Sequence, residues 1–190
     1  MNRSPIWFER KFDFTFPVEL HPNVCARLRG TPVRLEEIVR NADHDVLVRK
    51  PRQNEKWSAQ EHAGHLLDLE PLWMARVHDY LDNYRTEAAE LTVADLSNRK
   101  TFEAQHNQRP IEEILAEFRS ARSRLMSRVE EIDPAICART LLHPRMRTPM
   151  RLVDHLYFVA EHDDHHLVHI WELINAGQRG KHESNARIRK

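Results

Sequence analysis

The sequence has 190 residues, with 29 Lys or Arg against 29 Asp or Glu, so its formal net charge is zero. This balance excludes the globally basic protein that binds nucleic acid or anionic membranes without specificity. Two cysteines are too few for a disulfide framework, no apolar run would span a membrane, and the first residues lack the apolar core of a signal peptide. We therefore expect a soluble, cytoplasmic protein.

Residues 1–30 are predicted to form an N-terminal aromatic arm and a lead-in helix. Phe12, Phe14 and Phe16 alternate along the arm, which places their rings on one side of an extended segment. Such a row is expected either to lie as a strap across the domain or to form a dimer contact, because aromatic side chains often anchor interfaces. Part of 18–29 is also compatible with a helix, although Pro22 interrupts it.

Two helical patterns follow the arm. Thr31-Pro32 has the order of an N-cap followed by proline, which predicts a helix that begins here and ends near Asp43. Ser58 with Glu61 three residues later is a capping box, and it predicts a second helix that continues to about Leu81.

Two more helices are predicted after a long polar connection at 83–109. Apolar residues recur at helical spacing over 110–132, and a last helix is expected to begin at Thr148-Pro149 and to end before Gly177. No β-hairpin pattern stands out. The sequence thus predicts an all-α, four-helix bundle with a long crossover connection, and its predicted domains are the arm at 1–30, the bundle at 31–176 and a basic C-terminal tail at 177–190.

Common catalytic motifs are absent from the chain. It contains only four glycines, and it has no G-x-G-x-x-G motif, no Walker A motif and no G-x-S-x-G elbow. The H-E-x-x-H motif of zinc proteases is also missing. These absences argue against the common nucleotide-binding, serine-hydrolase and zincin classes.

The last predicted helix has histidines along the edge of its apolar stripe. At roughly 100° per residue, His155, His162 and His166 fall on this edge, whereas His165 falls on the polar side. The i,i+4 spacing of His162 and His166 brings their side chains close enough to share one metal ion, with imidazole as the commonest transition-metal ligand. A third ligand would have to come from another helix.

The second predicted helix offers two candidates for this third ligand, His62 and His65. By position on the helical wheel His62 is slightly more central, so local geometry does not decide between them. The alternative to a metal site is a polar seam between helices, in which the histidines are satisfied by hydrogen bonds to aspartate and backbone groups. Spacing alone leaves both interpretations open.

Two segments resemble the DinB-like superfamily, also known as YfiT-like metal-dependent hydrolases. Residues 57–68 read WSAQEHAGHLLD and residues 161–166 read EHDDHH, in the order and separation of that family. The resemblance implies a four-helix bundle with a divalent metal on three histidines: His65 from the H-L-x-D segment, and His162 and His166 from the H-x-x-x-H pair. It thereby favours His65 over His62 as the third ligand.

A site of three histidines leaves a coordination position open, as in catalytic metal sites. A water or a cosubstrate thiol could be activated there, and all-nitrogen ligation suits zinc, nickel or iron as well as copper. Asp68 is either a partner that orients His65 or a solvated carboxylate, and His62 is either an acid–base helper or a core histidine. Arg139, Arg145 and Arg147 precede the last helix and are candidates for binding an anionic substrate, although an ordinary solvated loop is favoured.

The expected function is that of a divalent-metal-dependent enzyme, either a hydrolase or a thiol S-transferase. Its expected partners are a small-molecule substrate, a low-molecular-weight thiol and a second copy of the chain as a homodimer, with no membrane and no nucleic acid. The alternative is a non-catalytic metal-binding or stress-response bundle, which would have a fourth protein ligand and no adjacent cavity. A di-iron bundle is disfavoured, because the two histidine segments contain no Glu-x-x-His motif.

Overall fold

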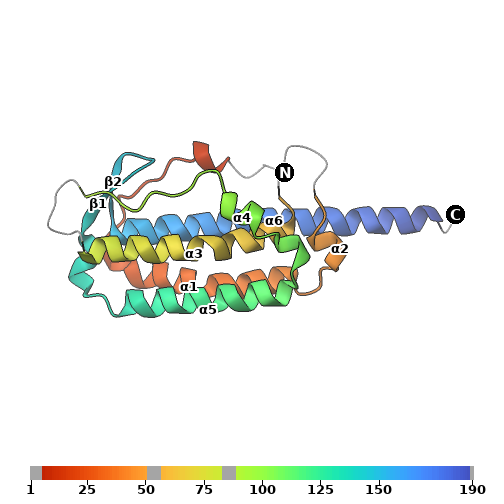
Figure 1. The fold of residues 1–190 in the computed structure, drawn as a ribbon, viewed down its shortest axis with the longest axis horizontal. Coiled ribbons are helices and arrows are strands. Elements are labelled where there is room, and N and C mark those ends of the chain that lie inside the picture. The colour runs from red at the N-terminus through yellow and green to blue at the C-terminus, as the bar shows by residue number, and fades with distance from the viewer. Residues whose placement is uncertain (1–5, 51–56, 83–88, 189–190) are drawn as a thin grey trace.

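The computed structural model describes residues 6–50, 57–82 and 89–188, with side chains described as far as residue 179. Four long helices lie along the same axis and confirm the predicted all-α, four-helix bundle (Figure 1). No helix in the described ranges is long and apolar enough to cross a membrane. The four helices are α1 (His21–Val39), α3 (Ala59–Asp82), α5 (Ile111–Glu130) and α6 (Leu152–Ile188).

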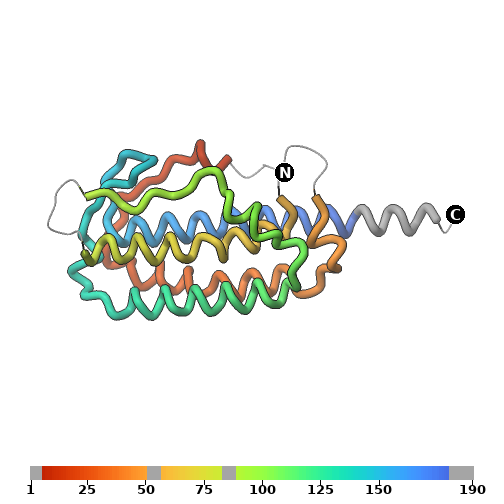
Figure 2. The backbone as a smooth tube through the Cα atoms, in the orientation of Figure 1, coloured from red at the N-terminus to blue at the C-terminus, as the bar shows by residue number. Residues whose placement is uncertain are grey.

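The direction of the helices explains the long crossover. In the tube drawing α1 and α6 run one way along the bundle and α3 and α5 run the other way (Figure 2). Because α3 and α5 are parallel, the chain between them has to return along the length of the bundle. This crossover contains α4 (Arg99–Glu103) and the short 3-10 helix η3 (His106–Gln108). The predicted long crossover is therefore confirmed, and the described part of the connection, 89–109, lies across one side of the bundle, whereas 83–88 lie outside the described residues.

A β-hairpin that the sequence analysis did not predict precedes α6. Strand β1 (Thr140–His143) pairs antiparallel with β2 (Thr148–Arg151), and the crossover adds an isolated parallel bridge from Glu90 to Leu142. The remaining short elements are η1 (Trp7–Glu9), η2 (Val18–Leu20), α2 (His44–Leu47) and η4 (Pro134–Ala138).

The aromatic arm lies as a strap on the bundle, as one of the two expectations proposed. Phe12, Phe14 and Phe16 are half-buried while their neighbours in sequence are exposed, which confirms the period of two. Their rings pack against Tyr157 and Phe158 of α6. The arm, the crossover and the hairpin all lie on the same side of the bundle (Figure 1).

The predicted helix start at Thr31-Pro32 is wrong, because both residues lie inside α1. A proline within a helix cannot donate a hydrogen bond to the carbonyl four residues earlier. Here that carbonyl belongs to Leu28, and it accepts a hydrogen bond of 3.1 Å from Nη1 of Arg122 instead. Pro32 is therefore tolerated because a neighbouring helix satisfies the group that it leaves free.

Both predicted ends of the last helix are also wrong. Thr148-Pro149 lies in β2, where Pro149 is opposite Leu142. The backbone groups of Leu142 form hydrogen bonds with Ala89 and Leu91 of the crossover, so they need no N–H group from Pro149. The helix begins instead at Leu152.

At the other end, α6 continues past Gly177 to Ile188, so the described part of the predicted tail at 177–190 is helical backbone, and 189–190 lie outside the described residues. A Cβ on Gly177 would lie 2.8 Å from Cγ1 of Val46. This glycine therefore allows α2 to pack closely against α6 and does not end the helix.

A buried ion cluster of Glu70, Arg122 and Asp163 joins the four helices. The Arg122 guanidinium on α5 donates to Oε1 of Glu70 on α3 at 2.6 Å and to Oδ2 of Asp163 on α6 at 2.5 Å. The hydroxyl of Thr31 on α1 donates to the same Asp163 oxygen at 2.8 Å. This cluster occupies the layer between the two apolar parts of the core, which lie toward opposite ends of the bundle.

We expect Arg122→Met to lower the free energy of unfolding by about 3–5 kcal/mol, because it leaves two buried carboxylates without their cation. Urea denaturation monitored by circular dichroism measures this loss. Arg119→Met is the matched control, since Arg119 lies on the exposed face of α5 and pairs there with Glu36. Equal destabilisation by the two substitutions would contradict the role given to the ion cluster.

Candidate metal centre

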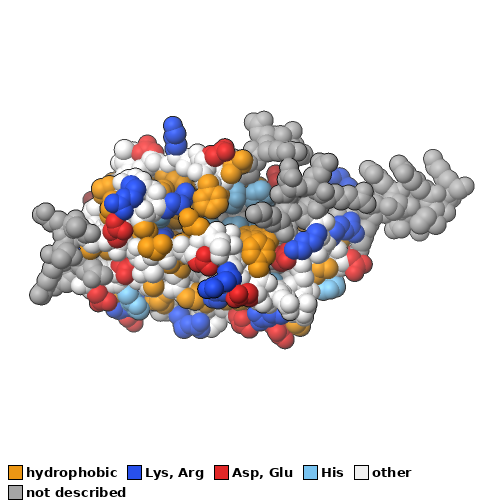
Figure 3. Space-filling view, turned by 45° about the horizontal axis from the view of Figure 1, so that its top comes forward, with side chains coloured by type: hydrophobic (Ala, Val, Ile, Leu, Met, Phe, Trp, Pro, Cys, Tyr) orange, Lys and Arg blue, Asp and Glu red, His pale blue; other side chains and the backbone are white. Residues whose placement is uncertain are grey.

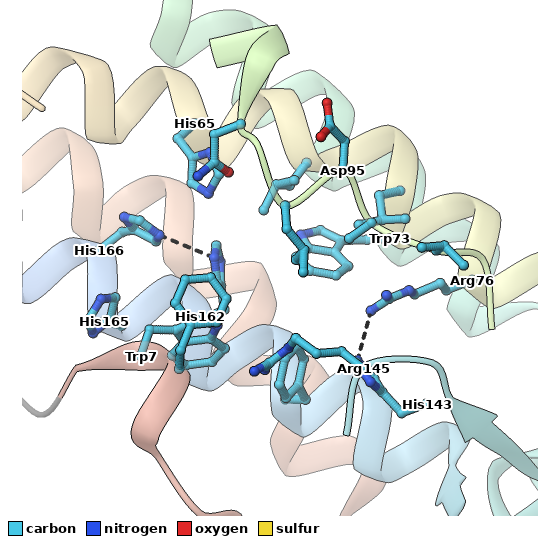
Figure 4. A pocket seen from close by; sticks show the side chains of 18 of the residues that line it. Trp7, His65, Trp73, Arg76, Asp95, His143, Arg145, His162, His165 and His166 are labelled. Carbon is cyan, nitrogen blue, oxygen red and sulfur yellow. Dashed lines mark hydrogen bonds between the residues drawn. The ribbon is translucent and has the colours of Figure 1, made fainter. Parts of the chain in front are cut away.

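His65, His162 and His166 come together between α3 and α6. One ring nitrogen from each lies within 4.8 Å of the others, and all three side chains are buried. Figure 4 shows the three rings facing one another at one end of a pocket. The structure thus assembles the three residues that the resemblance singled out.

Local helix geometry positions the histidines of both α3 and α6. The backbone N–H of Ser58 donates to Glu61 and the backbone N–H of Glu61 donates to the Ser58 hydroxyl, so the predicted capping box forms at the start of α3. One turn separates His162 from His166 on α6, and their Nε2 atoms are 3.2 Å apart.

Burial keeps the three imidazoles neutral. Desolvation lowers the pKa of His65 to about 4, and it holds the pKa values of His162 and His166 well below the ordinary range. The proximity of the other histidines acts in the same direction. A neutral imidazole has a free lone pair, which is the form that binds metals.

His166 is oriented by His62. The two Nδ1 atoms are 2.8 Å apart, so one ring donates and the other accepts. If the proton is on Nδ1 of His166, its Nε2 lone pair faces His162. His62 therefore contacts the candidate ligand His166 from behind and is not itself part of the group of three. The helical wheel places His62 slightly more centrally than His65.

His65 is oriented through Thr101 of the crossover. Its Nδ1 lies 3.0 Å from the Thr101 hydroxyl, which is hydrogen-bonded in turn to Asp68. Burial alone would raise the pKa of Asp68, but hydrogen bonds from His106 and Thr101 hold it below the usual value. An ionised carboxylate only accepts, so Thr101 donates to Asp68 and accepts from Nδ1–H of His65. Nε2 of His65 is left with its lone pair.

Asp68 is a buried residue and not a solvated carboxylate. Its Oδ2 lies 2.8 Å from Nε2 of His106, in the 3-10 helix of the crossover. Gly64 makes this contact possible, because a Cβ at that position would lie 2.2 Å from the His106 ring. The crossover is thereby fixed against α3 in the position that brings Thr101 to His65.

The donor set could hold a metal ion. Two nitrogens that share a tetrahedral zinc ion at about 2.0–2.1 Å lie roughly 3.3 Å apart, close to the observed separation of His162 and His166. Two of the three rings use their remaining nitrogen for a hydrogen bond, as ligating histidines usually do. Within the described ranges no fourth His, Cys, Asp or Glu joins the group.

A cavity of about 570 Å³ opens onto the three histidines. Tryptophan side chains surround this end, with Trp57 packed on His65 and with Trp7 and Trp73 against His162. Histidine side chains are visible between hydrophobic ones near the middle of the face in Figure 3. A bound metal would therefore be reached from solvent through a largely apolar pocket.

The comparison with family models agrees with this arrangement. The model of the DinB superfamily matches residues 27–170. The chain belongs to the DinB superfamily. No protein with curated annotation matches the sequence.

Among solved structures, this DinB superfamily member is similar to YfiT from Bacillus subtilis. The TM-score is 0.69 at 19% sequence identity, and the alignment covers 87% of this chain and 91% of YfiT. YfiT is described as a probable metal-dependent hydrolase with an unusual four-helix bundle topology. At this identity the similarity establishes a shared fold.

The other predicted residues take different positions. His155 is fully buried beside Trp73 and Tyr80 and does not line the cavity. His165, expected on the solvent side, is half-buried and lines the cavity next to Trp7, because the arm covers that side of α6. Of the three candidate arginines, only Arg145 lines the cavity.

Sequence reasoning missed two kinds of residue. Thr101 and His106 lie in the crossover, where no periodic pattern predicts which side chains face α3. Arg76 and His143 line the far end of the cavity. A signal for Arg76 was present, since it lies three residues after Trp73 on the apolar stripe of α3, where a cation is unusual.

Thr101→Val should weaken metal binding by about 10- to 100-fold, because it removes the hydrogen bond that orients His65 without changing a ligand. Titration of metal-free protein with Zn²⁺ by isothermal calorimetry measures the effect. Thr148→Val, at an exposed position in β2, is the control. Unchanged affinity in Thr101→Val would show that this hydrogen bond does not support the site.

Proposed function

We propose that this protein is a divalent-metal-dependent enzyme that acts on a small molecule, with His65, His162 and His166 as the metal ligands. The observation that carries the proposal is the combination of three neutral, converging imidazoles with an accessible cavity. Zinc, nickel and iron are the candidate metals, since all three accept nitrogen ligands. The protein is expected to act in the cytoplasm.

Two reaction classes use the same site. Hydrolysis is supported by membership of the DinB superfamily and by the fold shared with YfiT. Transfer to or from a low-molecular-weight thiol is the second class, because a metal also stabilises a thiolate. When bound, the cation supplies Lewis acidity to either reaction.

The surrounding residues have distinct tasks in this proposal. His62 and Thr101 hold two of the ligand rings in orientation. Trp7, Trp57 and Trp73 limit the access of water and lower the local dielectric constant, which strengthens electrostatic interactions inside the pocket. Since Trp7 comes from the arm, the arm is part of the site as well as a strap. A homodimer contact through the arm stays a prediction.

The non-catalytic alternative is less well supported. A structural metal site would be closed by a fourth protein ligand and would need no cavity, whereas the described residues bring three candidate ligands together beside a pocket. A di-iron site would need several inward carboxylates. The carboxylates in the centre of the bundle, Glu70 and Asp163, are both bound to Arg122.

We expect the wild-type protein to bind one divalent metal per chain. His162→Ala should bind the metal more than about 100-fold more weakly, because losing a ligand costs more affinity than losing a residue that only hydrogen-bonds to a ligand. Metal analysis after dialysis measures binding. Ester-hydrolysis and thiol-conjugation assays on metal-loaded protein, with chelation and metal return, measure activity.

His78→Ala is the matched control, because His78 is an exposed histidine on α3 away from the site. This variant should retain the metal and the activity. Wild-type metal content in His162→Ala, or activity that survives complete chelation, would overturn the proposed function.

A further inference from the structure

The end of the cavity opposite the three histidines carries positive charge. Arg76 of α3, His143 of β1 and Arg145 of the hairpin turn line this end (Figure 4). Neither arginine forms an ion pair with any residue in the described parts of the chain. The other buried guanidinium, Arg122, is bound by two carboxylates.

Arg76 is the more unusual of the two arginines, with 2% of its surface exposed. Its Nε donates to the carbonyl of Thr92 at 2.9 Å, and its guanidinium lies 5.5 Å from the centre of the Trp73 ring. Desolvation lowers its pKa to about 10, which leaves it charged at neutral pH. A charge this buried is ordinarily paired, so the absence of a counter-ion here points to an external one.

His143 adds a second donor at the same place. Its Nδ1 lies 3.2 Å from the backbone nitrogen of Met146, and its Nε2 lies 3.3 Å from Nη1 of Arg76 (Figure 4). A neutral imidazole has a single acceptor nitrogen, so the ring can accept from only one of these two N–H donors. An acceptor oxygen from a ligand would satisfy the N–H group that is left over at this end.

Arg145 of the hairpin turn adds a second guanidinium to the lining of the same cavity. Its guanidinium lies 5.1 Å from the centre of the Phe8 ring and makes no hydrogen bond to a described residue. By contrast, Arg139 donates to the carbonyl of Tyr80, and Arg147 pairs with Glu90 on the surface. Arg145 is thus the hairpin arginine that is free to contact a ligand in the cavity.

We propose that Arg76, His143 and Arg145 bind the carboxylate of an elongated organic substrate. Its apolar body would lie along Trp73 and Phe158, and its reacting end would lie at the three histidines. This inference rests on the proposed function for the reacting end only; the anion site itself needs no metal.

The walls between the two ends favour an organic anion over an inorganic one. Leu69, Leu72, Trp73 and Phe158 line the middle of the cavity. His65 and Arg76 are eleven residues apart on α3, which corresponds to roughly 16 Å along the helix axis. Such a span matches a molecule with an apolar body and one charged end. A guanidinium binds a planar carboxylate with two parallel hydrogen bonds.

Asp95, the one acidic residue among the described residues that line the cavity, does not neutralise this end. Asp95 is exposed, its Oδ1 accepts hydrogen bonds from Ser97, and its carboxylate points away from Arg76 (Figure 4). Asp79 also acts on Arg76 through space, but it does not line the cavity, and its Oδ2 accepts from the backbone N–H of Thr92. The described lining of this end therefore carries two arginines against one exposed carboxylate, a balance that favours a negatively charged ligand.

The test compares 4-phenylbutyrate with its neutral amide, 4-phenylbutyramide, by isothermal calorimetry on metal-free and zinc-loaded protein. Wild-type protein should bind the carboxylate about 10- to 100-fold more tightly than the amide, with or without zinc. Arg76→Met and Arg145→Met should each reduce this preference by about 10-fold or more. Arg147→Met, in the same hairpin but outside the cavity, should leave it unchanged.

Arg145→Met keeps the test decisive if Arg76→Met does not fold, because Arg145 makes no hydrogen bond to a described residue and its loss should not affect folding. Equal affinity of wild-type protein for the acid and the amide, or the same preference in both variants, would overturn the proposal. Inorganic phosphate that binds as tightly as 4-phenylbutyrate would overturn the apolar part of it. If the carboxylate preference is found but no metal binds, the proposed function fails and the anion site stands.

Discussion

The position of the candidate site depends on one buried guanidinium. Arg122 holds Glu70 of α3 and Asp163 of α6, and it also bonds the Leu28 carbonyl of α1. Asp163 must therefore face the centre of the bundle, and this fixes the rotation of α6 about its axis. His162 precedes Asp163 directly, so the same rotation directs the histidine pair toward α3 and the cavity. The ion cluster thus sets the geometry of the site without contributing a ligand.

Burial has opposite consequences in the two polar regions of the bundle. Where charges are paired, as at Arg122, burial strengthens the attraction and joins helices. At His162 and His166 burial removes the charge and leaves neutral ligands. At Arg76 burial leaves a cation without a counter-ion from the described residues, and this is why that end of the cavity favours an anion. One apolar pocket therefore joins a ligand set at one end to an unpaired charge at the other.

The sequence predicted what depends on contacts within a helix. The capping box at Ser58 and the i,i+4 pair on α6 are local, and both formed as expected. The prediction from Thr31-Pro32 was wrong because an N-cap signal has meaning only where a helix begins, and Arg122 on another helix satisfies the carbonyl that Pro32 leaves free inside α1. The helix end predicted at Gly177 was wrong because this glycine leaves space for the side chain of Val46 and does not end α6. Thr101 gave no signal, and Arg76 could be noticed on the apolar stripe of α3 but not given a role, since the partners of both residues are distant in sequence and depend on the folded crossover and hairpin.

The most direct test of the central claim is X-ray absorption spectroscopy at the zinc edge of zinc-loaded protein. The account predicts three imidazole nitrogens at about 2.0–2.1 Å, one each from His65, His162 and His166. A fourth imidazole would mean that a further histidine closes the site, and a spectrum without imidazole scattering would mean that the three rings only form a polar seam. Either result would contradict an open metal centre in this bundle.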